Sequence, residues 1–168
     1  MDLTIRPERA EDIKQIAAVT IAAFEHAEHT SHTEHFIVDA LRNTGQLTVS
    51  LVAEENTLVV GHVAISPVTV SSGATGWYGL GPLSVLPDWQ GRGIGSALMQ
   101  AALSDLQQQG AAGCVVLGDP GYYGRFGFKV QAGLVLPGVP QEYFQALPFA
   151  GEVPEGAVQY HSSFDAAE

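Results

Sequence analysis

The sequence predicts a mixed α/β (α+β) fold, and three observations lead to this class. An amphipathic helical pattern near the N-terminus is followed by two strand-like segments, the first of which alternates apolar and polar residues. A glycine-rich turn then joins an apolar strand-like segment to a long stretch without glycine or proline. That stretch leads into a short apolar segment, typical of a buried strand parallel to the one before the turn. We therefore expect a sheet with helices packed on it.

The 168 residues, of which 46% are hydrophobic, fit one globular domain spanning residues 1–168. No apolar run is long enough to span a bilayer, and the first residues, MDLTIRPERAED, do not form a signal peptide pattern. Cys114 is the only cysteine, so an internal disulfide is excluded. We expect a cytoplasmic protein without a membrane partner.

The formal net charge is −11, from 18 acidic and 7 basic residues. This balance argues against a nucleic-acid partner, because phosphate contacts need lysine and arginine. It mildly favours a cationic substrate such as an amine. The positive charges are few, and two of them, Arg92 and Arg125, lie in glycine-rich segments.

The N-terminal part is expected to contain a short strand, Leu3 to Arg6, and two helices. The first helix has an apolar face with helical spacing, formed by Ile13, Ile16, Ala17, Thr20, Ile21 and Phe24. A polar, histidine-rich segment from His26 to His35 follows, and the second helix runs from about Glu34 to Arg42.

The central part is expected to form a hairpin and a third strand. Leu47 to Glu54 and Leu58 to Val70 are the hairpin strands, the second interrupted near Pro67. Trp77 to Val85 is the next strand, and Pro82 within it predicts a bulge or a splay from the neighbouring strand.

The remaining elements follow the glycine-rich turn. A helix is expected from Ser96 to Gln109, and the apolar residues Cys114 to Leu117 form a buried strand. The glycine- and proline-rich tail contains the apolar run Leu134-Val135-Leu136, and in it we expect a helix around Gln141 to Leu147 and a last strand near Ala157 to Phe164.

The turn Gln90-Gly91-Arg92-Gly93-Ile94-Gly95 has the features of an anion site. Glycines let the backbone approach a ligand, the following helix presents unpaired N–H groups, and Arg92 adds a positive charge. The segment is neither a Walker A loop nor a GxGxxG dinucleotide fingerprint. Taken alone, the glycines also fit a tight turn that caps a buried helix.

The turn, entered through VLPDWQ, resembles the acyl-CoA pyrophosphate loop of the GNAT superfamily of N-acetyltransferases. The string LGDPGYYGRFGF contains a second family pattern, Tyr-x-x-x-Gly-Phe, from Tyr123 to Phe128. The resemblance extends from about Leu3 to Phe164 and is sharpest from Leu47 to Phe128, where it points to a bacterial subgroup. It implies the GNAT fold: a mixed central sheet of about six to seven strands, helices on both faces, and splayed fourth and fifth strands.

The resemblance also implies a site for acetyl-CoA. The pyrophosphate would be bound by the loop and the start of its helix, which comprise Gln90, Gly91, Arg92, Gly93, Ile94, Gly95 and Ser96. The pantetheine and the thioester carbonyl would lie along Leu83, Ser84 and Val85. Tyr123 holds the position of the tyrosine that protonates the thiolate, although Tyr122 beside it competes and an aromatic anchor is the structural alternative. The family often has an asparagine after the fifth strand that contacts the pantetheine arm. This chain has Asp119 there instead, which leaves two alternatives: Asp119 makes the contact, or the contact is missing.

Acyl transfer also needs a group that takes the proton of the amine. Glu25 is our first candidate and His62 a second; the other candidates in the first helical region are Glu28, Glu34, His26, His29, His32 and His35. Each could instead be a solvated loop residue, and a chain of water molecules could do the work. The uniform histidine spacing does not fit HExxH, so we expect no metal.

The sequence therefore predicts an acetyl-CoA-dependent N-acetyltransferase that acts on an amine by direct transfer in a ternary complex, since Cys114 is expected to be buried. Two alternatives remain: a non-catalytic acyl-CoA-binding module that acts as a sensor or partner subunit, and a phosphate-binding protein that takes ATP or NAD. The sequence leaves open which amine is the acceptor and whether the chain forms a homodimer.

Overall fold

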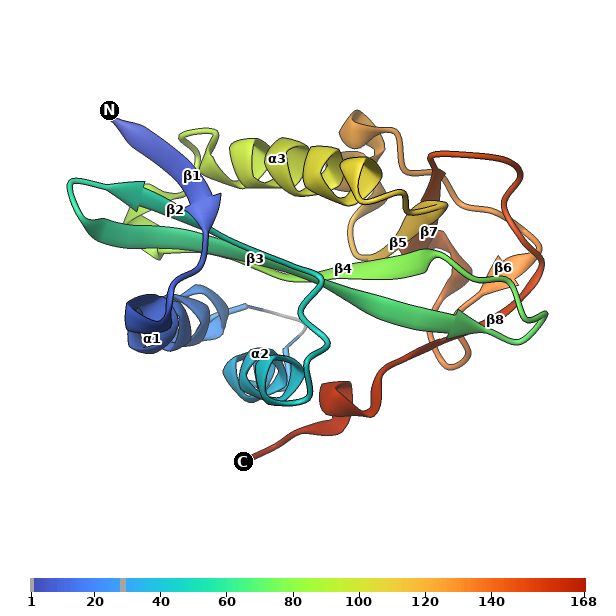
Figure 1. The fold of residues 1–168 in the computed structure, drawn as a ribbon, viewed down its shortest axis with the longest axis horizontal. Coiled ribbons are helices and arrows are strands. Elements are labelled where there is room, and N and C mark those ends of the chain that lie inside the picture. Colours follow the sequence, from blue (N-terminus) through green and yellow to red (C-terminus); the bar gives the residue numbers. More distant parts are fainter. Residues whose placement is uncertain (1, 28–29) are drawn as a thin grey trace.

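A computed structural model describes residues 2–27 and 30–168 and places a mixed sheet between two helical layers (Figure 1). Helices α1 (Ile13–Phe24) and α2 (Glu34–Asn43) lie on one face of the sheet, and α3 (Ile94–Gln108) lies on the other. This arrangement confirms the expectation that helices cover both faces of the sheet. The final short helix, α4 (Pro120–Tyr123), follows the fifth strand.

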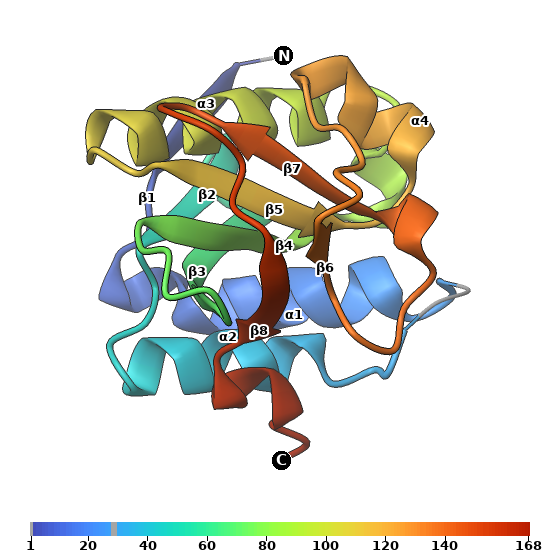
Figure 2. The same cartoon turned by 90° about the vertical axis from the view of Figure 1, so that its right-hand side faces the viewer.

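Six strands form a continuous path across the sheet. Their order is β1 (Leu3–Pro7), β2 (Val49–Glu55), β3 (Leu58–Val70), β4 (Trp77–Val85), β5 (Gly113–Leu117) and β7 (Phe144–Pro148). The β4–β5 pair is parallel, as expected, and the other neighbours are antiparallel. The short strands β6 (Leu134–Val135) and β8 (Gly156–Tyr160) pair with each other, and β8 also pairs with β3 (Figure 2). With these two strands the sheet has eight strands, one more than the six to seven expected from the sequence.

The expected irregularity at Pro82 is confirmed as a bulge in β4. Val63 of β3 faces Leu83, whereas Ile65 faces Leu80, so Gly81 and Pro82 together oppose a single residue. The parallel pairing with β5 ends at Leu80, while β4 runs on to Val85. Beyond Leu80 the two strands therefore diverge, which is the splay that the sequence led us to expect.

The interruption expected near Pro67 is wrong, because β3 is continuous from Leu58 to Val70. On the β2 side, the last pair joins Val49 to Ile65, and the Thr48 N–H donates to the Ile65 carbonyl. Alternation directs the backbone of Pro67 toward that same edge, where β2 has already ended. The missing proline N–H therefore breaks no hydrogen bond of the sheet.

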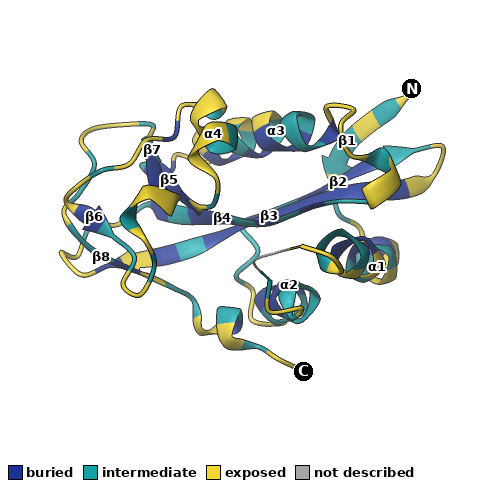
Figure 3. Ribbon diagram, turned by 180° about the vertical axis from the view of Figure 1, so that it is seen from behind, coloured by how far each residue is buried: buried dark blue, intermediate teal, exposed yellow. Residues whose placement is uncertain are grey.

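Apolar cores lie on both faces of the sheet (Figure 3). On the α3 side, the fully enclosed residues include Leu98, Met99 and Leu106. On the other side, α1 and α2 pack on Val52 and Val59 of the sheet. Ile21, expected on the buried face of α1, is instead 49% exposed, and Val19 is buried in the same helix. None of the helices that the structure describes is long and apolar enough to cross a membrane.

The tail departs most from the expected elements. Gln141–Tyr143 is a 3-10 turn, and Phe144–Pro148 is strand β7, where we expected a helix. The residues QEYFQALP favour a helix locally, but the open edge of β5 accepts them as a strand, with Phe144 and Gln145 buried. The last strand ends at Tyr160, because Ser162–Asp165 forms a 3-10 turn in which the His161 ring accepts from the Ser163 N–H.

Candidate active site

The glycine-rich turn leads directly into α3 and leaves the helix start open. Gly91 and Gly93 have φ values of +78° and +82°, a conformation that suits glycine. The first intrahelical bond runs from the Ala97 N–H to the Gly93 carbonyl, at 3.0 Å, and no side chain caps the helix. The N–H groups of residues 94–96 therefore have no acceptor within the helix. Together with the helix dipole, they form a site suited to an anion.

The diverging end of β4 adds backbone groups beside this anion site. The Leu86 N–H donates to the Val60 carbonyl of β3, so alternation turns the backbone of Val85 and Leu83 toward the edge that β5 has left. Nε2 of Gln90 donates to the Val85 carbonyl at 3.1 Å. The loop is thereby tied to the strand, and the N–H groups of Val85 and Leu83 face the opening between β4 and β5.

Loop, strand edge and α4 enclose one groove with a volume of about 430 Å³. It brings together eight residues of the predicted cofactor site: Leu83, Val85, Gln90, Gly91, Gly93, Ile94, Gly95 and Ser96. Trp89, Tyr122 and Arg125 also line it, although the sequence did not assign them to the cofactor. The sequence feature that could have identified Arg125 as a groove residue is its position: it is one of few basic residues and lies in a glycine-rich motif.

Two arginines flank the groove without a carboxylate partner. Arg92 lies over the Trp89 ring at 4.9 Å, and Arg125 lies over the Tyr122 ring at 4.7 Å. Neither forms an ion pair within residues 2–27 and 30–168, whereas Arg6 and Arg42 are each held by two carboxylates. The aromatic rings orient the two guanidinium groups and leave their charge available to an anion.

The two adjacent tyrosines of α4 occupy different places. A Cβ on Gly95 would lie 2.9 Å from the Tyr122 hydroxyl, so this hydroxyl rests on the first turn of α3. Tyr123 is partly buried and packs edge-on to Tyr122, with ring centroids 5.0 Å apart. Burial, with smaller contributions from Tyr122 and Asp119, raises the pKa of Tyr123 to about 12. Its phenol is therefore fully protonated at neutral pH.

Besides Arg92 and Tyr123, three predicted site residues are not among those that line this groove. Ser84 is 1% exposed and pairs with His62 on β3; its Oγ has no hydrogen-bond partner in the part of the chain that is described. Asp119 caps α4, accepting from the Gly121 N–H at 2.9 Å, and borders another hollow with Tyr143. Glu25 is exposed just after α1. It lines a small separate hollow with other candidate bases, His32, Glu34 and His35.

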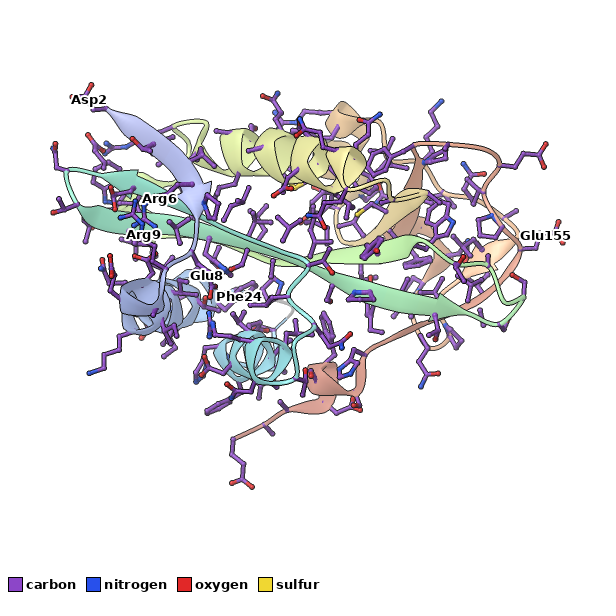
Figure 4. The ribbon with its side chains drawn as sticks, viewed as in Figure 1. Asp2, Arg6, Glu8, Arg9, Phe24 and Glu155 are labelled. Carbon is purple, nitrogen blue, oxygen red and sulfur yellow. The ribbon has the colours of Figure 1, made fainter. Side chains whose placement is uncertain are left out.

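The second candidate base, His62, is enclosed in a polar network on the α1/α2 side of the sheet. Its Nε2 lies 2.8 Å from Ser50 Oγ, and Ser50 also hydrogen-bonds Glu8, which lies on this side in Figure 4. Arg42 donates to Glu8 at 2.7 and 2.9 Å. Burial, aided by Arg42 and opposed by Glu8, lowers the pKa of His62 to about 4. His62 is therefore neutral and inaccessible at physiological pH.

Three candidates for the general base remain: His26, Glu28 and His29. His26 is exposed, whereas Glu28 and His29 lie outside the described residues. Across residues 2–27 and 30–168, no group of three histidine, cysteine, aspartate or glutamate side chains is placed to hold a metal ion.

A parallel strand pair that diverges beside a glycine loop and a helix N-terminus defines the acyl-CoA-dependent acetyltransferase class, and comparison with known proteins gives the same class. Residues 46–130 match the family model of the acetyltransferase (GNAT) domain. The chain belongs to the GNAT family of acetyltransferases.

Individual relatives resemble this chain over most of its length. It is 37% identical over 137 residues to YhbS of Escherichia coli K12, described as an uncharacterized N-acetyltransferase; the match covers 77% of this chain and 81% of YhbS. A GNAT acetyltransferase of Brucella melitensis, crystallised with acetyl-CoA, is 49% identical, with a TM-score of 0.87 over 97% of this chain and 98% of that one. The crystal structure of E. coli YhbS with CoA gives 36% identity and a TM-score of 0.87, covering 97% and 92% of the two chains.

Proposed function

We propose that this chain, as one domain, transfers the acetyl group of acetyl-CoA directly to a primary amine within a ternary complex. The observation that carries the proposal is the junction at the end of β4, where the opening toward β5 meets the uncapped start of α3. The two similar crystal structures contain acetyl-CoA or CoA, which supports the same ligand here.

The groove residues divide the work of binding. The N–H groups at the start of α3 and the loop glycines hold the pyrophosphate, and Arg92 and Arg125 add positive charge from two sides. The N–H groups of Val85 and Leu83 hold the pantetheine and polarise the thioester carbonyl, because they lie on the unpaired edge of β4.

The proton balance of the reaction assigns the remaining roles. The amine nitrogen bonds to the carbonyl carbon, the carbon–sulfur bond breaks, and the proton lost by nitrogen balances the proton gained by sulfur. Tyr123 supplies a proton to the leaving thiolate, and Glu25, reached through water, takes the proton of the amine. Cys114 is 0% exposed and burial raises its thiol pKa, so a covalent acetyl-enzyme is not expected.

Calorimetry with acetyl-CoA tests the cofactor site. We expect micromolar binding that is lost in Gly93→Asp, which places bulk and negative charge in the loop. Gly110→Asp is the matched control, because Gly110 has a similar φ of +87° and open surroundings but follows the other end of α3. Failure of the folded parent protein to bind acetyl-CoA would refute the proposal.

Release of CoA thiol in the presence of spermidine, tyramine and polylysine tests the transfer step. We expect turnover with at least one amine, reduced by Tyr123→Phe and by Glu25→Gln. If acetyl-CoA binds but no amine releases CoA, the chain is a binding module and not a transferase for these acceptors.

A further inference from the structure

Tyr160, at the end of β8, reaches from the C-terminal segment to the middle of β4. A Cβ on Gly79 would overlap ring atoms Cε1 and Cδ1 of Tyr160. Only glycine at position 79 therefore lets this ring lie against the strand. Gly79 is the residue before Leu80, where the pairing of β4 with β5 ends. The ring thus lies at the closed end of the opening between the two strands.

The two tyrosines approach this opening from opposite faces of the sheet. Leu80 and Tyr123 belong to the apolar cluster on the α3 side. Successive side chains of a strand point to opposite faces, so Gly79 faces the α1/α2 side, and the Tyr160 ring covers it there. Each tyrosine ring packs on a glycine next to the opening. Tyr160 packs on Gly79 of β4, and Tyr123 packs on Gly118, the residue just after β5.

The Tyr160 phenol is partly buried and lies near Tyr123. Burial raises its pKa, and Cys114 and Tyr123 are close enough to raise it further. Within residues 2–27 and 30–168, neither the Tyr123 hydroxyl nor the Tyr160 hydroxyl forms a hydrogen bond. Tyr160 also borders a surface groove of about 530 Å³, and its ring stacks on Phe164, with ring centroids 4.9 Å apart. Tyr160 is therefore partly buried, and its hydroxyl is free to bind a ligand.

We propose that the Tyr160 hydroxyl faces the acetyl group from the α1/α2 side and accepts a hydrogen bond from the attacking amine. This inference rests on the proposed function and adds a second phenol to the reaction centre. The phenol stays protonated, so it orients the nitrogen and removes no proton from the balance. Tyr123 serves the leaving sulfur on one face, and Tyr160 serves the incoming nitrogen on the other.

Fluorine NMR of protein labelled with 3-fluorotyrosine tests this placement without a known acceptor. The chain has five tyrosines, whose signals are assigned from single Tyr→Phe variants. With CoA and with acetyl-CoA, the signals of Tyr122 and Tyr123 are expected to move. The Tyr160 signal is expected to differ between the two ligands, because only acetyl-CoA carries the acetyl group, while Tyr143, which is 44% exposed, stays unchanged.

The outcomes separate the inference from the proposed function. One outcome is that the signals of Tyr122 and Tyr123 move while the Tyr160 signal keeps the same chemical shift in the free, CoA-bound and acetyl-CoA-bound protein. In that case the inference is wrong and the cofactor site stands. If no tyrosine responds, the cofactor site itself is wrong, and the inference falls with it.

Kinetics with the best amine of the acceptor panel provides the second measurement. Tyr160→Phe keeps the ring on Gly79 and removes only the hydroxyl. We expect it to lower kcat/KM for the amine about tenfold while the Kd for acetyl-CoA changes less than about twofold. Tyr143→Phe controls for loss of a phenol elsewhere, and Phe164→Leu controls for packing behind the ring. Equal kcat/KM in Tyr160→Phe and the parent would overturn the role.

Discussion

Gly118 and Tyr123 fit each other so closely that a Cβ on Gly118 would lie 2.5 Å from Cε2 of the tyrosine ring. The first residue after β5 therefore positions the phenol that we assign to the leaving thiolate. This contact joins the end of the diverging strand to Tyr123, the last residue of α4 and five residues further along the chain.

Gly118→Ala is expected to displace the Tyr123 ring and to lower the free energy of unfolding by about 1–3 kcal/mol. It should also lower turnover, because the phenol leaves its place. Gly124→Ala is the matched control: Gly124 has nothing within 4 Å of its Cβ position, so both properties should stay unchanged. Urea unfolding and CoA release measure the two effects; equal stability in the two variants would contradict the close fit.

Tyr123→Phe should lower kcat about 100-fold and leave acetyl-CoA binding unchanged, since only a proton donor is lost. Because the pKa of Tyr123 is raised to about 12, its deprotonation should not shape the rate between about pH 6 and 9. The pH profiles of parent and variant should therefore run parallel in this range. A decline of the parent rate above pH 8 that is absent from the variant would contradict the assignment.

Arg125→Gln is expected to weaken CoA binding about tenfold and to reduce its dependence on salt, because one phosphate contact is lost. Lys129→Gln makes the same change of charge at an exposed cation that does not line the groove, and should leave binding unchanged. Calorimetry at two salt concentrations makes the comparison. Equal losses in the two variants would indicate a general charge effect instead of a contact from Arg125.

The core of the fold was predictable from sequence because local patterns and long-range pairing agree there. The hairpin of β2 and β3, the bulge at Pro82 and the helix after the glycine loop all follow from patterns within a few residues. The tail was not predictable, because Phe144 and Gln145 become a strand only through the open edge of β5. The same limit hid Tyr160: its contact with Gly79 joins residues far apart in sequence, and no local motif marks it.

The buried thiol of Cys114 gives a further test of direct transfer. Its thiol should not react with Ellman's reagent in the folded protein, and one thiol should react in guanidinium chloride, because the side chain is 0% exposed and its pKa is raised by burial. Cys114→Ser should retain transfer activity if the protein remains folded. Rapid labelling of the native protein, or a trapped acetyl-Cys114 that turns over, would contradict a direct mechanism.

His62 makes the stability of the fold depend on pH. Burial lowers its pKa to about 4 from an ordinary value of 6.5, so between these values the unfolded chain binds a proton that the folded chain does not. Stability from this group is fully present above about pH 6.5 and is lost as the pH falls toward 4. The loss approaches about 3 kcal/mol at the low end. The negative charge of Glu8 opposes the lowering of the His62 pKa, but Arg42 is hydrogen-bonded to Glu8 and its positive charge lowers the pKa further.

Urea unfolding at about pH 5 and pH 7.5 measures this dependence. His62→Gln replaces the imidazole by an amide that can still hydrogen-bond Ser50 but is not protonated in this range, so the free energy of unfolding of this variant should differ less between the two pH values than that of the parent. His26→Gln, at an exposed position, should retain the full difference. If His62→Gln retains it as well, the pH dependence comes from other groups, and the enclosure of His62 does not determine the acid limit of the fold.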